Sequence, residues 1–189
     1  AQGASITHGS GSYPVYNGGI LQVDGEYIAS PVVVWVSWAT LRVSSTGSVT
    51  GPGRLIISAS DISQMDGVID VATMNIYRVS DADPIVPATF DSPTVEITNA
   101  IDTTSRTWSP AAGTYTFNGN VTISGNISPS GGTFTIDNSV NNPNFVFNGN
   151  VTVDNGTSEL IWTKGTGTIT VGGTSTQSLN FLGKTVEDI

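Results

Sequence analysis

Three carboxylates in the second half of the chain are the first candidates for chemistry. Asp137, Asp154 and Glu159 lie beside short apolar stretches, and enzymes that hydrolyse glycosidic bonds use two carboxylates that flank the scissile bond. Each aspartate is followed by an asparagine, at Asn138 and Asn155, directly after a predicted strand. Because Asp and Asn favour turns at such positions, we interpret these carboxylates as turn residues and predict no catalytic residue.

Calcium binding is the second kind of chemistry that the acidic residues suggest. Asp61, Asp66 and Asp70 cluster, and Asp81 and Asp83 form a short pair. Carboxylate oxygens on loops suit Ca²⁺, but neither group has the ligand spacing of an EF-hand or of the nonapeptide calcium repeat. We therefore interpret them as solvated loop acids and caps, and we predict no metal site and no cofactor.

Composition restricts thiol and imidazole chemistry. The chain has no cysteine, and His8 is its only histidine, so disulfides, thiolate catalysis and histidine-rich metal sites are excluded within it. A Ser-His-Asp triad would have to use His8, which lies in a Gly/Ser-rich stretch that offers a catalytic base no rigid setting. We expect a protein that is not an enzyme.

Four tryptophans are the main candidates for recognition. Trp35 and Trp38 are three residues apart and would point to opposite faces of one strand. We therefore predict that one packs in the core and that the other fills an interface, where tryptophan is enriched. Trp108 and Trp162 suit stacking on sugar rings, although core packing is the commoner use.

Four N-x-Ser/Thr sequences begin at Asn120, Asn126, Asn150 and Asn155. The second half of the chain is so rich in asparagine, serine and threonine that about three such sequences are expected by chance under the simple acceptor rule. These sequences therefore do not indicate glycosylation.

An internal repeat indicates the elements that would position these residues. Residues 117–123 (Phe-Asn-Gly-Asn-Val-Thr-Ile) return thirty residues later as residues 147–153, with six of the seven positions identical. A fainter third copy occupies residues 181–186. Repetition at a fixed period is typical of chains that stack one structural unit on the next. The repeat therefore predicts stacked coils, with its phenylalanines filling the interior.

Apolar and polar residues alternate through the second half, which predicts strands. The predicted strands cover residues 114–117, 133–136, 144–147, 159–162 and 166–171. Threonine and asparagine suit stacked rungs because identical side chains in register form hydrogen-bonded ladders. This half predicts a short parallel β-solenoid, a β-helix-like region, and fits an antiparallel meander less well.

The first half predicts strands of mixed burial, some apolar on both faces as in the core of a sandwich. These strands cover residues 31–38, 40–43, 53–58, 70–79 and 94–98. Residues 46–53, with three glycines and a proline, predict a turn or exposed loop. Residues 80–93 predict a loop with Ile85 and Val86 pointing inward. Residues 60–66 allow a single helical or 3₁₀ turn.

Asparagine divides the chain into two parts. Residues 1–108 contain three asparagines and residues 109–189 contain eleven, whereas the acidic residues number ten and five. Residues 109–113 have the composition of a linker or turn. We therefore predict an all-β chain with a flexible N-terminal arm over residues 1–19, a β-sandwich-like assembly domain over residues 20–108, and the β-solenoid repeats after it.

The charge of the chain excludes two classes of partner. Only 11% of the residues are charged, the net charge is -9, and the six Lys and Arg residues are scattered. Nucleic acids and anionic membranes attract clustered Lys and Arg. No apolar run approaches the length of a membrane span. We expect no nucleic-acid partner and no membrane insertion.

The Phe-Asn-Gly-Asn-Val-Thr pattern carries a resemblance to a broad class of proteins. Together with residues 161–170 and 177–189, it resembles the β-solenoid repeats of phage tail-fibre or spike proteins and of bacterial surface adhesins. The resemblance covers residues 113–189. It implies an elongated structural or attachment protein, and it transfers no catalytic residue to this chain.

Both ends of the chain suggest assembly. Residues 186–189 lie inside a predicted strand, so we expect the stack to be left open for more chain or for another subunit. Residues 1–19 are expected to be either an arm that lends a strand to a neighbour or a disordered tail.

These features favour a non-enzymatic structural protein of a virion, such as a tail-fibre, spike or capsid-decorating component. One alternative is an extracellular filament or adhesin subunit that polymerises by strand exchange. A second alternative is a carbohydrate-binding or depolymerising module. We expect a homo-oligomer, or a lattice with other structural subunits, and a cell-surface glycan as a further partner. The expected location is the virion or the cell surface.

Overall fold

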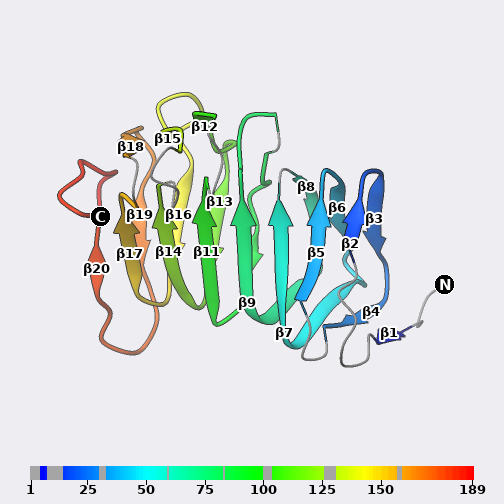
Figure 1. Ribbon diagram of the computed structural model, residues 1–189. Helices are drawn as coiled ribbons and strands as arrows, with labels where there is room; N and C mark the ends of the chain where they lie inside the picture. The colour runs from blue at the N-terminus through cyan, green and yellow to red at the C-terminus, as the bar shows by residue number, and fades with distance from the viewer. Residues whose placement is uncertain are drawn as a thin grey trace.

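The computed structural model of the protein describes residues 5–7, 15–29, 33–58, 60–82, 84–99, 104–125, 131–156 and 159–189. Over these residues the protein is all-β, with twenty strands and no helix. The strands form four sheets that stack coil upon coil into a β-solenoid (Figure 1). The predicted all-β class and the solenoid architecture are confirmed.

One long sheet runs the length of the stack, and three short sheets complete the coils. The long sheet contains β1 (Ser5–Thr7), β2 (Val15–Asn17), β4 (Glu26–Ile28), β5 (Val33–Ser37), β7 (Ser48–Ser58), β9 (Val68–Tyr77), β11 (Thr94–Thr98), β14 (Asn120–Ser124), β17 (Val151–Asp154) and β20 (Leu179–Asn180). The first short sheet contains β3 (Ile20–Val23), β6 (Thr40–Val43) and β8 (Asp61–Met65). The second contains β10 (Thr89–Phe90), β13 (Thr114–Phe117), β16 (Asn144–Phe147) and β19 (Ile169–Val171). The third contains β12 (Arg106–Trp108), β15 (Phe134–Asp137) and β18 (Leu160–Thr163).

Every strand pair is parallel, so each strand lies on its counterpart in the next coil. The structure does not show the predicted β-sandwich in the described part of residues 20–108. The strands of this region belong to the same stack, and β9, β11 and β14 carry the long sheet across residue 109. In β5 the outward positions Val33 and Trp35 are themselves apolar, so this one-face-buried strand reads in the sequence like a strand buried on both faces.

Coil length separates the two halves of the chain. Ser48 pairs with Val68, twenty residues later, whereas Thr114 pairs with Asn144, thirty residues later. Both β13–β16 and β14–β17 have this thirty-residue spacing, which makes the repeat visible in the sequence there. The shorter coils of the first half stack in the same way, but their amino-acid sequences are not repeated from coil to coil.

The predicted third copy of the repeat is wrong in register. In the second short sheet Phe147 pairs with Val171, and Phe181 instead follows β20. Phe181 still contacts the core, because its ring lies edge-on to Phe147 with the centroids 6.5 Å apart. The side chain thus fills the end of the interior from a different strand.

Two local predictions in the first half are wrong, both at ladder irregularities. Residues 61–65 form strand β8 rather than a helical turn, and the register shifts between Leu41 and Arg42 opposite it. This irregularity places Ile62 and Met65 inward three residues apart, which imitates a helical spacing. Residues 48–53 belong to β7 rather than to a loop, and the register shifts again between Gly51 and Arg54.

The predicted loop over residues 80–93 is correct in part. Ile85 is buried and bridges to Ile62, and Val86 packs against the core, as expected. The loop also contains a short strand, β10, that pairs with β13.

Inward side chains form columns along the axis of the stack. Phe90, Phe117 and Phe147 are fully buried and stack with centroids 4.9 Å and 5.5 Å apart. Tyr115 and Phe145 form a parallel column beside them, 5.6 Å apart. Offset-stacked rings of this kind stabilise the fold beyond the area that they bury. The core is therefore continuous along the stack, and successive coils build it together.

The Phe column can be tested with one buried and one outward residue of the same strand. Phe147→Ala should lower the free energy of unfolding by about 3–5 kcal/mol, because it removes a fully buried ring. Val146→Ala, whose side chain faces outward on β16, should cost about 1 kcal/mol or less. Urea unfolding followed by far-UV circular dichroism measures both, and equal losses would contradict the assigned faces.

Candidate functional site at the ends of the coil stack

The C-terminal end of the stack presents three strands that need protection. Strands β18, β19 and β20 are last in their sheets, so each has a strand partner on one side only among the described residues. A last strand exposes unpaired N–H and C=O groups to which another chain can pair. Residues 181–189 lie across this end, and their contacts decide whether it is open.

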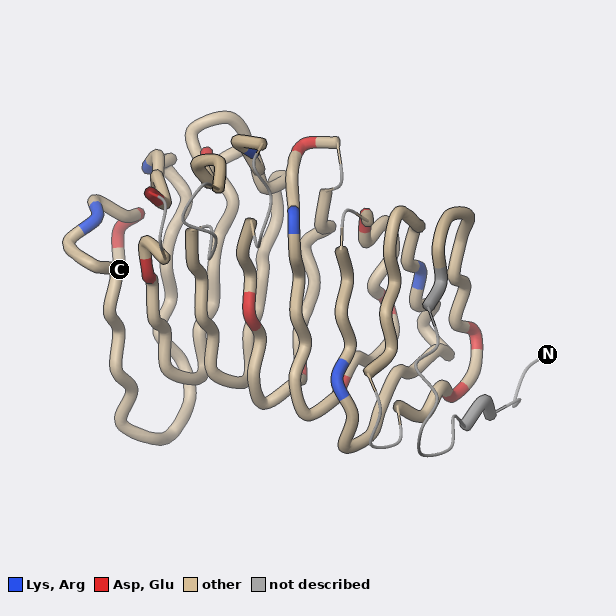
Figure 2. Tube along the Cα trace, in the orientation of Figure 1, with Lys and Arg blue, Asp and Glu red and all other residues tan. Residues whose placement is uncertain are grey.

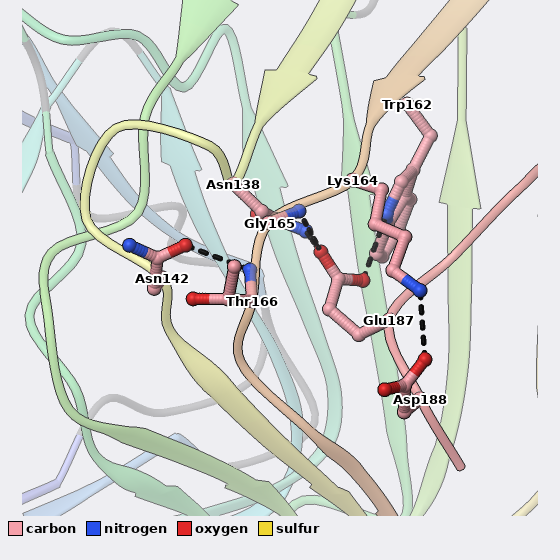
Figure 3. A network of polar contacts seen from close by, with 8 residues as sticks. All are labelled: Asn138, Asn142, Trp162, Lys164, Gly165, Thr166, Glu187 and Asp188. Carbon is pink, nitrogen blue, oxygen red and sulfur yellow. Dashed lines mark hydrogen bonds and ion pairs between the residues drawn. The ribbon is translucent and has the colours of Figure 1, made fainter.

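Glu187 is the centre of this closing segment. Its side chain is only 2% exposed, and its carboxylate accepts hydrogen bonds from Asn138 Nδ2 (2.7 Å), Trp162 Nε1 (3.0 Å) and the Gly165 backbone N–H (2.9 Å) (Figure 3). A buried charge is costly unless it is hydrogen-bonded. Three donors from two neighbouring coils meet that requirement and fix the segment in place.

Two lysines hold the same segment against the strand edges. Lys164 Nζ lies 2.7 Å from Asp188 Oδ1, and Lys184 Nζ donates to the carbonyl oxygen of Leu160 in β18. The hydrogen bond from Lys164, together with its charge, holds the pKa of Asp188 below its usual value. The Asp188 carbonyl accepts from the N–H of Ile169 at 2.8 Å, which continues the β19 ladder by one bond.

Apolar side chains of the segment cover the end of the core. The Phe181 ring lies edge-on to Trp162, with the centroids 6.0 Å apart, and Val186 packs against the core. Residues 186–189 form no strand apart from the single bridge at Asp188, so the strand predicted there is wrong. The segment turns over the end of the stack instead of extending it.

The N-terminal end differs in its chemistry. Strands β1, β2 and β3 are first in the stack, and they pair only with β4, β5 and β6 among the described residues. None of the residues in these three strands is Lys, Arg or Pro, the residues that commonly block edges. Ile20 in β3 is 59% exposed. Among the described residues no further strand pairs with this edge, whereas residues 181–189 lie over the C-terminal edge.

Part of the predicted N-terminal arm is folded onto its own chain. Strand β1 pairs with β4, and β2 pairs with β5, in the outermost coil. The other residues of the arm, including His8, lie outside the described residues.

The predicted asparagine ladders are confirmed on the outer surface. Asn148 Nδ2 donates to Asn118 Oδ1 at 2.7 Å, and Asn118 Nδ2 donates to Asp91 Oδ1 at 2.6 Å. Asn120 Oδ1 accepts the backbone N–H of Asn150, whose own Oδ1 accepts the N–H of Ser178. Two of the N-x-Ser/Thr asparagines are therefore engaged in bonds between coils.

Of the remaining two N-x-Ser/Thr positions the structure describes one. Asn155 follows β17 with a buried side-chain oxygen that has no hydrogen-bond partner, and Asn126 lies outside the described residues.

The candidate catalytic carboxylates have turn geometry. Asp137 Oδ1 accepts from the N–H and the hydroxyl of Ser139, and Asp154 Oδ1 accepts from the N–H of Gly156. Asp137 ends a strand of the third short sheet and Asp154 ends a strand of the long sheet, while Glu159 precedes β18. Each aspartate thus stabilises its own turn.

The candidate calcium ligands are also engaged locally. Asp61 Oδ1 accepts from the Thr40 hydroxyl, and Asp66 Oδ2 accepts from Gln64 Nε2. Asp81 accepts from the N–H and hydroxyl of Ser109. Within the part of the chain that the structure describes, no three His, Asp or Glu residues are grouped to hold a metal ion. Asp70 is exposed in β9, and Asp83 lies outside the described residues.

The tryptophans divide differently from the prediction. Trp108 and Trp162 are buried, as expected. Trp35 and Trp38 are 41% and 60% exposed, so the prediction that one of them is buried is wrong. Strand β5 ends at Ser37, and Trp38 lies at the following corner, where strand alternation no longer applies.

Sequence reasoning missed Glu187 entirely. Its three hydrogen-bond partners are between 22 and 49 residues away along the chain. No local pattern distinguishes it from the exposed Asp188 beside it. A buried carboxylate of this kind becomes visible only when the coils are stacked.

Comparison with known proteins found no matching family, no similar curated protein and no similar solved structure. The described residues contain no helix long and apolar enough to cross a membrane.

Adjacent residues Glu187 and Asp188 allow a matched test of the closing segment. Glu187→Ala leaves three donors without their acceptor, so the free energy of unfolding should fall by about 2 kcal/mol or more. Asp188→Ala removes only an exposed ion pair and should change stability far less. Urea unfolding followed by the combined fluorescence of the four tryptophans measures both variants. Equal effects would show that Glu187 does not anchor the segment.

Proposed function

We propose that the protein is a non-enzymatic structural subunit of a virion, such as a tail-fibre, spike or capsid-decorating component, that joins other subunits at its N-terminal edge. The observation that carries the proposal is the contrast between the two ends of the stack. The C-terminal end is covered by residues 181–189 with the buried Glu187, whereas at the N-terminal end no further strand of the described residues pairs with β1, β2 or β3.

The architecture suits a mechanical role. Inter-coil hydrogen bonds run along the axis of the stack, and the buried columns are continuous through it. A force along the axis therefore loads many bonds and contacts in successive coils. A subunit of this kind transmits force and sets distance, which is what a fibre or spike component has to do.

Assembly at the N-terminal edge follows from the chemistry of strands. An exposed strand edge gains a full ladder of hydrogen bonds when another chain pairs with it. Strands β2 and β3 contain only apolar or uncharged polar residues, and the exposed Ile20 adds an apolar contact. The partner is expected to be another subunit, in a homo-oligomer or in a lattice.

The alternative of an extracellular filament or adhesin subunit has one observation in its favour. Strand β1 pairs with β4 and strand β2 pairs with β5, both in parallel. If a neighbouring copy supplied these two strands, the same parallel ladders would form between subunits. Labelled antibody on virions and on cell surfaces of the source distinguishes the two locations.

Assembly can be tested with one charge placed at either end. Ile20→Lys puts an ammonium group on β3 at the N-terminal edge. The dissociation constant of the assembled protein should rise at least tenfold. Val171→Lys, a comparably exposed position on β19 at the other end, should leave association unchanged. Sedimentation velocity over a range of concentrations measures both.

Two outcomes would contradict the assembly proposal. One is a wild-type chain that stays monomeric up to hundreds of micromolar. The other is a loss of association that is the same for both lysine variants, because this would place no special role at the N-terminal edge.

A further inference from the structure

The outer face of the long sheet carries a group of aromatic and polar side chains that the stacking does not require. We call it the Trp35 patch, and it consists of Trp35, Trp38, Arg54, Tyr77 and Glu96. Four of these residues lie on adjacent strands, β5, β7, β9 and β11, and Trp38 lies at the corner after β5. Elsewhere the charged residues are sparse along the stack (Figure 2).

Register places the members of the patch side by side. In the ladder Trp35 is opposite Ile56, and Val33 is opposite Arg54, so Trp35 and Arg54 are diagonal neighbours on adjacent strands. Adjacent strands are about 4.8 Å apart, and diagonal side chains at this spacing reach one another. The four strand residues of the patch are therefore neighbours on the outer face, and Trp38 follows Trp35 by three residues at the corner.

The two tryptophans are exposed in a way that packing does not explain. Trp35 and Trp38 leave 41% and 60% of their surface in water. Trp38 also has a backbone φ of 55°, in the left-handed region that residues other than glycine rarely adopt. Strain that burial does not offset is a feature of functional positions.

The corner of the preceding coil beside Trp38 consists of two glycines. The corner that stacks on Trp38 is formed by Gly18 and Gly19, since the Gly18 N–H bonds the Ser37 carbonyl and the Thr40 N–H bonds the Gly19 carbonyl. A methyl group added at either glycine would meet no atom within 4 Å. The preceding coil therefore has no side chain at this corner.

The polar members of the patch are held by hydrogen bonds to one another and to Asn75. Arg54 Nε donates to Asn75 Oδ1, and Asn75 Nδ2 donates to Glu96 Oε2. Arg54 Nη2 donates to the Tyr77 hydroxyl at 2.8 Å and lies 3.8 Å from Glu96 Oε2. Burial raises the pKa of Tyr77, so its hydroxyl stays protonated at neutral pH. Hydrogen-bonding groups are thus held in position before any ligand arrives.

This combination matches the chemistry of a sugar chain. A pyranose ring has an apolar C–H face that stacks on an indole, and its hydroxyls are bound by planar, bidentate groups such as guanidinium and carboxylate. We propose that the Trp35 patch binds a neutral oligosaccharide, with Trp35 and Trp38 as stacking platforms and with Arg54 and Glu96 contacting hydroxyls.

Charge selects among glycans. Arg54 is already paired with Glu96, so the patch has no free positive charge for an anionic sugar. The chain as a whole carries a net charge of -9 and repels polyanions. Neutral glycans should therefore bind better than sulfated or sialylated ones. This inference goes beyond the structural role proposed above and does not depend on it.

The test uses the full chain and isothermal titration calorimetry. The probes are cello-, laminari-, malto- and mannohexaose, with dextran sulfate as the anionic comparison. At least one neutral hexaose should bind, and Trp35→Ala and Trp38→Ala should each weaken that binding by at least tenfold. Ile161→Ala is the matched control, because Ile161 is a similarly exposed apolar residue on the third short sheet.

The results that would overturn the proposal are distinct. They are the absence of millimolar or tighter binding by any neutral hexaose, preferred binding of dextran sulfate, and hexaose affinity that is unchanged in both tryptophan variants. A loss of self-association in Trp35→Ala, measured by sedimentation with no change in hexaose binding, would assign the patch to a subunit interface instead. Failure of the Ile20→Lys prediction would leave this test intact.

Discussion

Parallel, in-register contact between successive coils is the constraint on which the rest of the structure depends. Inward residues must lie on inward residues, and the corners must let one coil approach the next closely. The Phe-Asn-Gly-Asn motif meets both requirements. The phenylalanine extends the buried column. The two asparagines bond to the coils on either side. A methyl group on Gly149 would lie only 2.3 Å from the carbonyl oxygen of Gly119, so glycine is required there.

This constraint explains how much of the fold the sequence can predict. In the second half the pairs β13–β16 and β14–β17 have the same thirty-residue spacing. The strands at residues 114–117 and 144–147 are therefore predicted to the residue. In the first half the ladder irregularities beside Leu41 and Gly51 change the spacing of inward residues. Alternation then fails as a guide, and β8 imitates a helical turn. The coils of this half are nearly equal in length, as in Ile20–Thr40, Thr40–Asp61 and Met74–Val95, but their residues are not repeated, so no sequence repeat reveals the stack.

The ends of the stack are where sequence reasoning fails for a different reason. The burial of Glu187 and the exposure of Trp38 depend on residues many positions away. No local sequence pattern indicates either. One is a carboxylate buried by partners from other coils, and the other is an indole left exposed by two glycines. The same stacking that buries the phenylalanines covers one end, leaves the other without a further strand among the described residues, and leaves Trp35 and Trp38 exposed. These three features are the basis of the assembly role and of the glycan site that we propose.

Cysteine cross-linking within the first half tests the continuous stack most directly, since the chain has no cysteine of its own. In the parallel ladder Thr50 is opposite Asp70, at a separation of about 4.8 Å that a disulfide can span. A Thr50→Cys/Asp70→Cys variant should cross-link on mild oxidation, whereas Thr50→Cys/Tyr77→Cys, the pair that an antiparallel sandwich hairpin would bring together, should not. The reverse result would contradict the account of one parallel solenoid running through both halves.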